Sequence, residues 1–159
     1  MPHLTELGLA SASGWCFMLT FVSAVCPWVN AEIIVASLPF VAHSRTALVW
    51  LVLVATAGQM GGNCLVYMGG RGSARVSSTR MAAAIARWRD RLGRTAHPLG
   101  FVLLSSAVGV PPFLVVTALW GALGFSFRPY FVVGTIGRLL RFSAIIGGQA
   151  LAMHAGGLW

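Results

Sequence analysis

The stretch PWVNAE, residues 27–32, breaks an uncharged apolar run and places a carboxylate directly after the break. Proline disrupts a helix because its ring removes a backbone donor and clashes with the preceding turn. Apolar sequence resumes beyond Glu32, and an ionisable group at membrane depth is costly unless it faces a cavity or a partner. The stretch therefore predicts a broken helix with a polar site beside it, and Glu32 is the first candidate site residue.

The composition places this stretch in an integral membrane protein. Hydrophobic residues make up 57% of the 159 residues and charged residues 9%, against about 25% charged residues in soluble domains. Mean hydropathy is +0.81, and the regular alternation that a transmembrane β-barrel requires does not occur. We expect an all-α membrane protein with a single domain, residues 1–159. The N-terminus lacks the basic flank of a signal peptide, so residues 7–25 are expected to remain as a membrane segment.

A basic loop, residues 71–98, divides the chain. It carries seven arginines against a single acid, Asp90, and the positive-inside rule makes such a loop cytoplasmic. Helical spacing of its apolar residues predicts an amphipathic helix on the membrane surface. A nucleic-acid-binding patch is disfavoured because the basic stretch is short and membrane topology explains it. The apolar residues are Met81, Ile85, Trp88 and Leu92.

Two short apolar segments follow the loop. Residues 99–110 and 113–127 would form helices of about 18 and 22 Å, whereas the hydrocarbon core is about 30 Å thick. Pro111 and Pro112 between them disfavour a continuous helix. A re-entrant hairpin, whose arms enter and leave by the same membrane face, fits both the lengths and the break.

The first half of the chain follows the same plan. Segments 14–26 and 31–42 flank a break that contains Pro27 and Asn30, and residues 47–68 are long enough to cross the membrane. Each half, residues 1–70 and residues 99–159, is then a hairpin followed by a spanning helix, which predicts two inverted units. In the alternative, the prolines kink ordinary spanning helices.

The segment AGQMGGNCLVYMGGR, residues 57–71, resembles the DedA family, also called the VTT or SNARE-associated family. The shared pattern is a Gly-rich membrane helix with a polar residue after Gly, a Tyr four positions on and a closing Gly-Arg. The Pro and Glu stretch before it, and the Pro pair, Gly121 and GRLLR at residues 137–141 after it, extend the resemblance over nearly the whole chain. The YqaA-like branch is the most similar.

The resemblance implies a multi-pass protein of the bacterial inner (cytoplasmic) membrane with two opposed re-entrant hairpins. It also implies a transporter or flippase for an anionic lipid or a lipid-linked phosphate, such as a polyprenyl phosphate. Functional acids of the family lie in the first hairpin, which Glu32 matches, and after a Gly of the next helix, where this chain has Asn63. An amide carries no titratable proton, so proton coupling would depend on Glu32. Arg128, Arg138 and Arg141 are nearest to the family's paired arginines.

Arg138 and Arg141 are the candidate cations of the site. A helix that begins at Tyr130 carries Arg138 about 12 Å inward, with Arg141 one turn further on the same face. Two guanidinium groups can bind a phosphate bidentately, and we expect Glu32 to be their counter-ion, with Arg138 as its partner. In the alternative, the last helix begins at Phe142 and both arginines are interfacial anchors.

Small residues on the two spanning helices predict close packing. Gly58, Gly61 and Gly62 lie on the first spanning helix, and Gly134 and Gly137 lie on the second. We expect these faces to meet at a central crossing lined by Asn63. No disulfide, metal or cofactor is expected, since the three cysteines lie in apolar surroundings without ligand spacing.

The sequence therefore predicts an anion site within a membrane bundle. The residues assigned to substrate binding are Glu32, Asn63, Arg138 and Arg141, and the hairpin breaks are Pro27, Asn30, Pro111 and Pro112. Membrane lipids are the expected partners, and the oligomeric state, a homo-oligomer included, stays open. An enzyme is not expected, because no Ser/His/Asp set, di-acid pair or metal cluster is visible. The competing hypothesis is a non-transporting protein that organises the bilayer or partner proteins.

Overall fold

The computed structural model describes residues 2–26, 28–42, 44–73, 83, 86–87, 89–90 and 97–155. Within these ranges the main elements are helices, and no strand occurs. Three helical segments are long and apolar enough to cross a membrane: Gly8–Val25, Arg45–Ser73 and Phe127–Ala152. The expected all-helical membrane class is confirmed. The helices are α1 (Pro2–Val25), α2 (Ala31–Val41), α3 (Arg45–Ser73), α5 (Pro98–Val108), α6 (Phe113–Ala122) and α7 (Phe127–Ala155).

The first helix, α1, is longer than the short arm predicted from residues 14–26. Its 24 residues correspond to about 36 Å, enough to cross a membrane. The boundary at residue 14 was wrong because Ser11 and Ser13 do not interrupt the helix, whereas the membrane segment expected at residues 7–25 matches the apolar span Gly8–Val25. Their hydroxyls donate to the carbonyls of Gly8 and Leu9, at 3.0 and 2.7 Å, and so satisfy their hydrogen bonds inside the helix.

The short helix α2 begins where the sequence places the break. Asn30 is its N-cap, and the Asn30 side chain accepts a hydrogen bond from the Glu32 amide at 2.8 Å. The backbone amides in the first turn of a helix have no carbonyl partner within the helix, and the Asn30 side chain supplies one for the Glu32 amide. Because the cap fixes the start of α2, Glu32 lies in its first turn.

The second pair of short helices, α5 and α6, is joined by a tight turn. Gly109 ends α5 with φ +86°, a left-handed conformation that glycine adopts without steric cost. The Ser105 hydroxyl donates to the Pro111 carbonyl at 2.7 Å, and Pro112 is the N-cap of α6. α6 ends at Ala122, before the predicted boundary at residue 127, and Phe127 instead begins α7.

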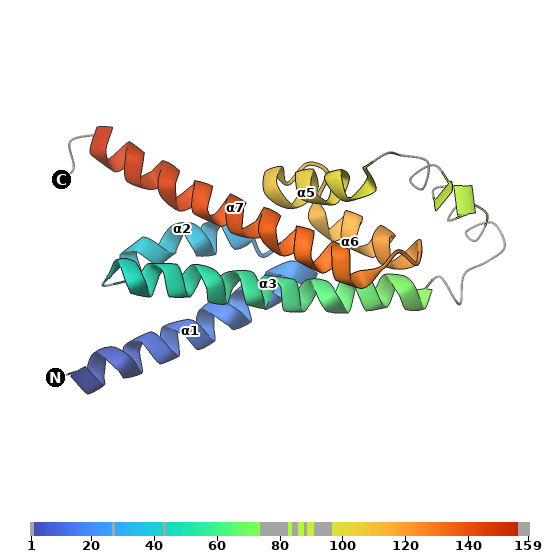
Figure 1. Cartoon of the computed structure of the whole chain (residues 1–159). Helices are drawn as coiled ribbons and strands as arrows, with labels where there is room; N and C mark the ends of the chain where they lie inside the picture. Colours follow the sequence, from blue (N-terminus) through green and yellow to red (C-terminus); the bar gives the residue numbers. More distant parts are fainter. Residues whose placement is uncertain are drawn as a thin grey trace.

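The two helix pairs point toward opposite ends of the molecule. Figure 1 shows α3 and α7 running along its whole length, with both termini at one end. The α1–α2 turn and the α5–α6 turn both lie partway along these long helices. From its turn, α2 runs back toward the end that holds the termini, whereas α6 runs toward the opposite end.

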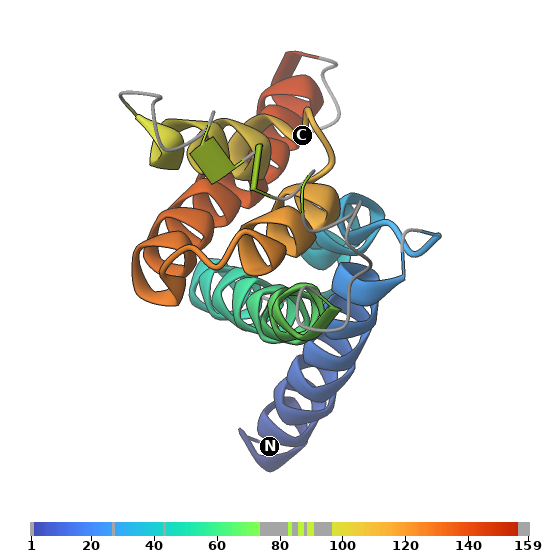
Figure 2. The ribbon, with the colours of Figure 1, turned by 90° about the vertical axis from the view of Figure 1, so that its right-hand side faces the viewer.

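The pairs also exchange packing partners between the two halves of the chain. α1 packs on α3 and α5 packs on α7, whereas α6 packs on α3 and α2 contacts α7 as well as α3. Seen end-on, α3 lies between α1 on one side and α6 and α7 on the other (Figure 2). Each half therefore contributes one short helix to the long helix of the other half.

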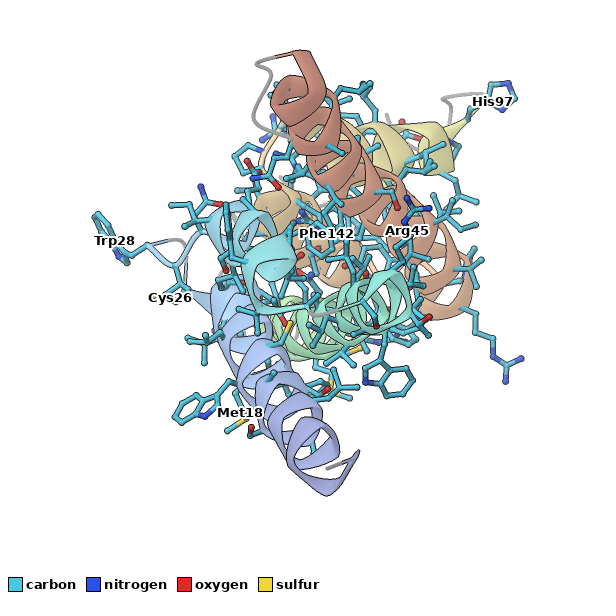
Figure 3. All side chains as sticks on the ribbon, turned by 90° about the vertical axis from the view of Figure 1, so that its left-hand side faces the viewer. Met18, Cys26, Trp28, Arg45, His97 and Phe142 are labelled. Carbon is cyan, nitrogen blue, oxygen red and sulfur yellow. The ribbon has the colours of Figure 1, made fainter. Side chains whose placement is uncertain are left out.

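Two apolar cores lie along the molecule. Phe142 of α7 belongs to the core formed with α1, α2 and α3, and Tyr130 of α7 belongs to the core formed with α3, α5 and α6. Met18 and Trp28 project outward, whereas Phe142 lies in the interior (Figure 3). Large apolar side chains on the outer face suit a lipid environment rather than water.

The glycine-rich face of α3 packs against α1, not against α7 as expected. A Cβ atom on Gly58 would lie 2.5 Å from the Phe17 carbonyl oxygen, and one on Gly62 would lie 2.7 Å from the Ala24 Cβ. Gly61 faces the Phe21 ring, with 3.3 Å between its added Cβ and the ring. Small side chains at these positions let the two helix backbones approach closely.

The glycines of α7 have other neighbours. A Cβ on Gly137 would lie 2.8 Å from the Ser106 Cβ of α5. One on Gly134 would lie 3.0 Å from the Phe113 ring of α6 and 3.2 Å from the Met60 Cε of α3. Gly134 therefore contributes to the contact between the long helices, but the expected meeting of two glycine faces does not occur.

Some predictions fall outside the described residues. Pro27 is one of them, although Trp28 and Asn30 of the same break are described. The apolar positions of the predicted surface helix, Met81, Ile85, Trp88 and Leu92, are the others.

Replacing Asn30 with Ala is expected to lower the free energy of unfolding by about 1 kcal/mol, because the cap of α2 is lost. Thermal unfolding in detergent measures the change. Ser37→Ala is the control, since the Ser37 hydroxyl donates to the Ile34 carbonyl within α2 and caps no helix end. Equal losses in the two variants would remove the capping role.

Candidate functional site

A cavity of about 250 Å³ lies where the two turns meet the long helices. Its wall combines the last turn of α1, the start of α2, a part of α3, the α5–α6 turn with the start of α6, and the middle of α7. The polar and charged side chains in this wall are Ser23, Asn30, Glu32, Gln59, Arg138 and Arg141. Broken helices and charged groups therefore share one site.

Three of the four predicted substrate-binding residues come together in this cavity: Glu32, Arg138 and Arg141. α7 is continuous from Phe127 to Ala155 and carries both arginines well inside the helix. The alternative in which the last helix begins at Phe142 is wrong. Apolar residues on each side of the arginines allow helix formation, and the guanidinium groups turn toward the cavity.

Asn63, the fourth predicted residue, lies away from the cavity wall. Its side chain is 1% exposed, and its Nδ2 donates to the Gln59 carbonyl of the same helix at 2.9 Å. Of the predicted break residues, Asn30 and Pro112 line the cavity. Pro111 is held beside them through its carbonyl, which accepts from Ser105.

Glu32 pairs with Arg141, not with Arg138 as expected. The Arg141 guanidinium donates to the Glu32 carboxylate, and its Nη1 also reaches the Ala107 carbonyl at 3.5 Å. Helix dipoles support this arrangement, because Glu32 lies in the first turn of α2 and Arg141 lies against the last carbonyls of α5. The ion pair thus connects one turn to the other.

Arg138 is buried without an ionic partner among the described residues. Its guanidinium carbon lies 4.7 Å from the centroid of the Phe113 ring, a cation–π contact at the start of α6. The side chain is 9% exposed, and the structure gives its Nε no hydrogen-bond acceptor within the described ranges. A buried cation in this state is stabilised when an anion enters the cavity.

Gln59 is a cavity residue that the sequence did not single out. It is 5% exposed, and its Oε1 has no donor among the described residues. Gln59 precedes Asn63 by four positions and so lies on the same face of α3. That spacing was the available signal, but the glycine-rich motif directs attention to Asn63.

The cavity has an excess of positive charge. Arg138 and Arg141 contribute two cations, and Glu32 contributes one carboxylate. Arg141 is already paired, so the positive charge that remains free is at Arg138. This arrangement can bind an anion of about the size of a phosphate group.

No family model matches the chain, and comparison with curated proteins and with solved structures also gives no match.

Proposed function

We propose that the protein is a DedA-like transporter or flippase of the bacterial inner membrane for an anionic lipid or a lipid-linked phosphate. The observation that carries the proposal is the buried Arg138, which has no ionic partner in the described part of the chain and lies in a polar cavity between broken helices. Irregular backbone and charged groups at membrane depth occur where they line a cavity that serves a ligand.

The arrangement of the helices supports two inverted units. In the proposed topology the C-terminal part of α1 with α2, and α5 with α6, form re-entrant hairpins, one entering from each membrane face, and α3 and α7 are the spanning helices. The opposite directions of the pairs in Figure 1, and the exchange of α2 and α6 between halves, are what this plan requires. Because α1 has 24 residues, its N-terminal part extends beyond the point at which a short hairpin arm would begin.

In the proposed cycle the ion pair competes with the substrate. Without substrate, Glu32 neutralises Arg141 and connects α2 to α7. A phosphate group attracted by Arg138 offers Arg141 a second anion, so Glu32 can leave and the two turns can separate. A proton taken up by Glu32 would release Arg141 in the same way, which gives one acid the coupling role.

Leaflet movement of a labelled polyprenyl phosphate in reconstituted vesicles tests the proposal. Arg138→Gln is expected to slow the movement at least tenfold, because the free charge of the cavity is lost. Arg128→Gln is the matched control, since Arg128 lies on the same helix, is exposed and does not line the cavity. It should retain the wild-type rate.

Equal rates in wild type and Arg138→Gln would remove Arg138 from the site. If wild-type protein moves no lipid at all, the competing hypothesis of a non-transporting organiser gains support. Neutralising the arginines between residues 80 and 94 would then be the next variant, because that hypothesis assigns function to the basic surface helix.

A further inference from the structure

Two helix N-termini open onto the cavity, and their chemistry differs. The N-terminus of α2 is capped by the Asn30 side chain and carries Glu32 in its first turn. The N-terminus of α6 follows Pro112, has no side-chain cap within the described residues and has no acid in its first turn. A helix N-terminus attracts negative charge. One terminus already has an anion, and the other does not.

Leu114 occupies the place in α6 that Glu32 occupies in α2. Each is the second helical residue after its N-cap, Pro112 in one case and Asn30 in the other. Both side chains line the cavity. The first-turn amides of Phe113 and Leu114 have no carbonyl to bind within the helix.

Arg138 and Gln59 stand beside this uncapped terminus. Phe113, over which the Arg138 guanidinium lies, is the first residue of α6. Gln59 contributes a nine-tenths buried amide whose Oε1 has no donor in the described part of the chain. Both side chains line the cavity together with Pro112, Phe113 and Leu114. Unpaired polar atoms of two buried side chains thus point to a ligand at this terminus.

We infer that the N-terminus of α6, Arg138 and Gln59 form an anion-binding subsite for a tetrahedral oxyanion of the phosphate class. The amides of Phe113 and Leu114 donate to its oxygens, Arg138 supplies the opposite charge, and the Gln59 Oε1 accepts a hydrogen bond from the hydroxyl of the protonated phosphate. Glu32 is the built-in anion of the equivalent place on α2. The inference rests on the proposed function, because it locates the phosphate of the transported lipid.

Calorimetric titration of the purified full chain with inorganic phosphate, and separately with dodecyl phosphate, tests the subsite. Leu114→Glu places a carboxylate at the α6 terminus and is expected to abolish binding of both ligands. Leu114→Gln, its neutral counterpart, keeps the backbone amide and should bind both at least tenfold more tightly than Leu114→Glu. The two differ in charge and little in shape, so a loss confined to Leu114→Glu reports competition for the subsite.

Gln59→Met gives an independent test. Loss of one hydrogen bond to a charged group is expected to weaken phosphate binding about tenfold. Gln149→Met is the control, because Gln149 also has a buried Oε1 without a partner among the described residues but lies outside the cavity wall. Its affinity should stay within twofold. Circular dichroism and unfolding midpoints verify that each variant folds.

The subsite is wrong if wild type binds neither ligand, or if folded Leu114→Glu and Gln59→Met both bind with wild-type affinity. Dodecyl phosphate binding at least tenfold tighter than inorganic phosphate identifies a lipid headgroup as the source, and equal affinities identify the free phosphate group. Both results support the subsite.

Two further results separate the subsite from the proposed function. Phosphate binding without leaflet movement overturns transport alone. Arg138-dependent movement that Leu114→Glu leaves unchanged overturns the subsite alone.

Discussion

Replacing Glu32 with Gln is expected to lower the free energy of unfolding by about 2 kcal/mol, because Arg141 is left charged and unpaired in the cavity wall. Breaking a fully buried pair costs about 3–5 kcal/mol. The smaller value applies here since 43% of the Glu32 side-chain surface and 16% of that of Arg141 remain accessible. Reversible thermal or detergent unfolding of the purified protein measures the loss.

A second substitution decides which arginine is the partner. Glu32→Gln combined with Arg141→Gln is expected to recover at least half of the loss, because removing both charges leaves none unpaired. Glu32→Gln combined with Arg138→Gln relieves repulsion between the arginines but still leaves Arg141 charged and unpaired. Its coupling free energy should be less than half as large, and equal couplings would contradict the observed pairing.

The pairing of Glu32 shows where sequence reasoning ends in this molecule. Local signals predicted the break at Asn30, the acid after it and a long helix that carries Arg138 and Arg141. All three charged residues do line one cavity. The arginines lie one turn apart on one helix face, so the sequence offers Glu32 two similar partners. The packing of α2 along α7, and of α5 beside Arg141, makes the choice.

The glycines of α3 show the same limit of sequence reasoning for helix packing. Small residues at Gly58 and Gly62 correctly predict that some backbone approaches closely. They do not identify which helix approaches, because α1 and α7 are both apolar and both long. Gln59 was overlooked for a related reason. Both Gln59 and Asn63 are buried, but only Gln59 lines the cavity, and this depends on how α3 is rotated against its neighbours.

Replacing both Gly58 and Gly62 with Ala is expected to destabilise the protein by about 3 to 4 kcal/mol, since each added methyl group collides with α1. The Cβ at position 58 would lie 2.5 Å from the Phe17 carbonyl oxygen and even closer to the Thr20 hydroxyl oxygen. That hydroxyl donates to the Cys16 carbonyl, and Thr20 is fully buried, so α1 itself must shift.

Gly69→Ala combined with Gly72→Ala is the matched control, because both positions lie on α3 and an added Cβ has no neighbour within 4 Å at either. Alanine is favoured over glycine inside a helix by about 1 kcal/mol, so this control should unfold at the same temperature as wild type or higher. The two double variants make the same chemical change in one helix and differ in what the methyl groups meet. If Gly58→Ala with Gly62→Ala is as stable as the control, α1 does not pack on α3 at these glycines. If only that variant loses stability, the close α1–α3 contact is what holds the α1–α2 turn, and with it Glu32, at the cavity.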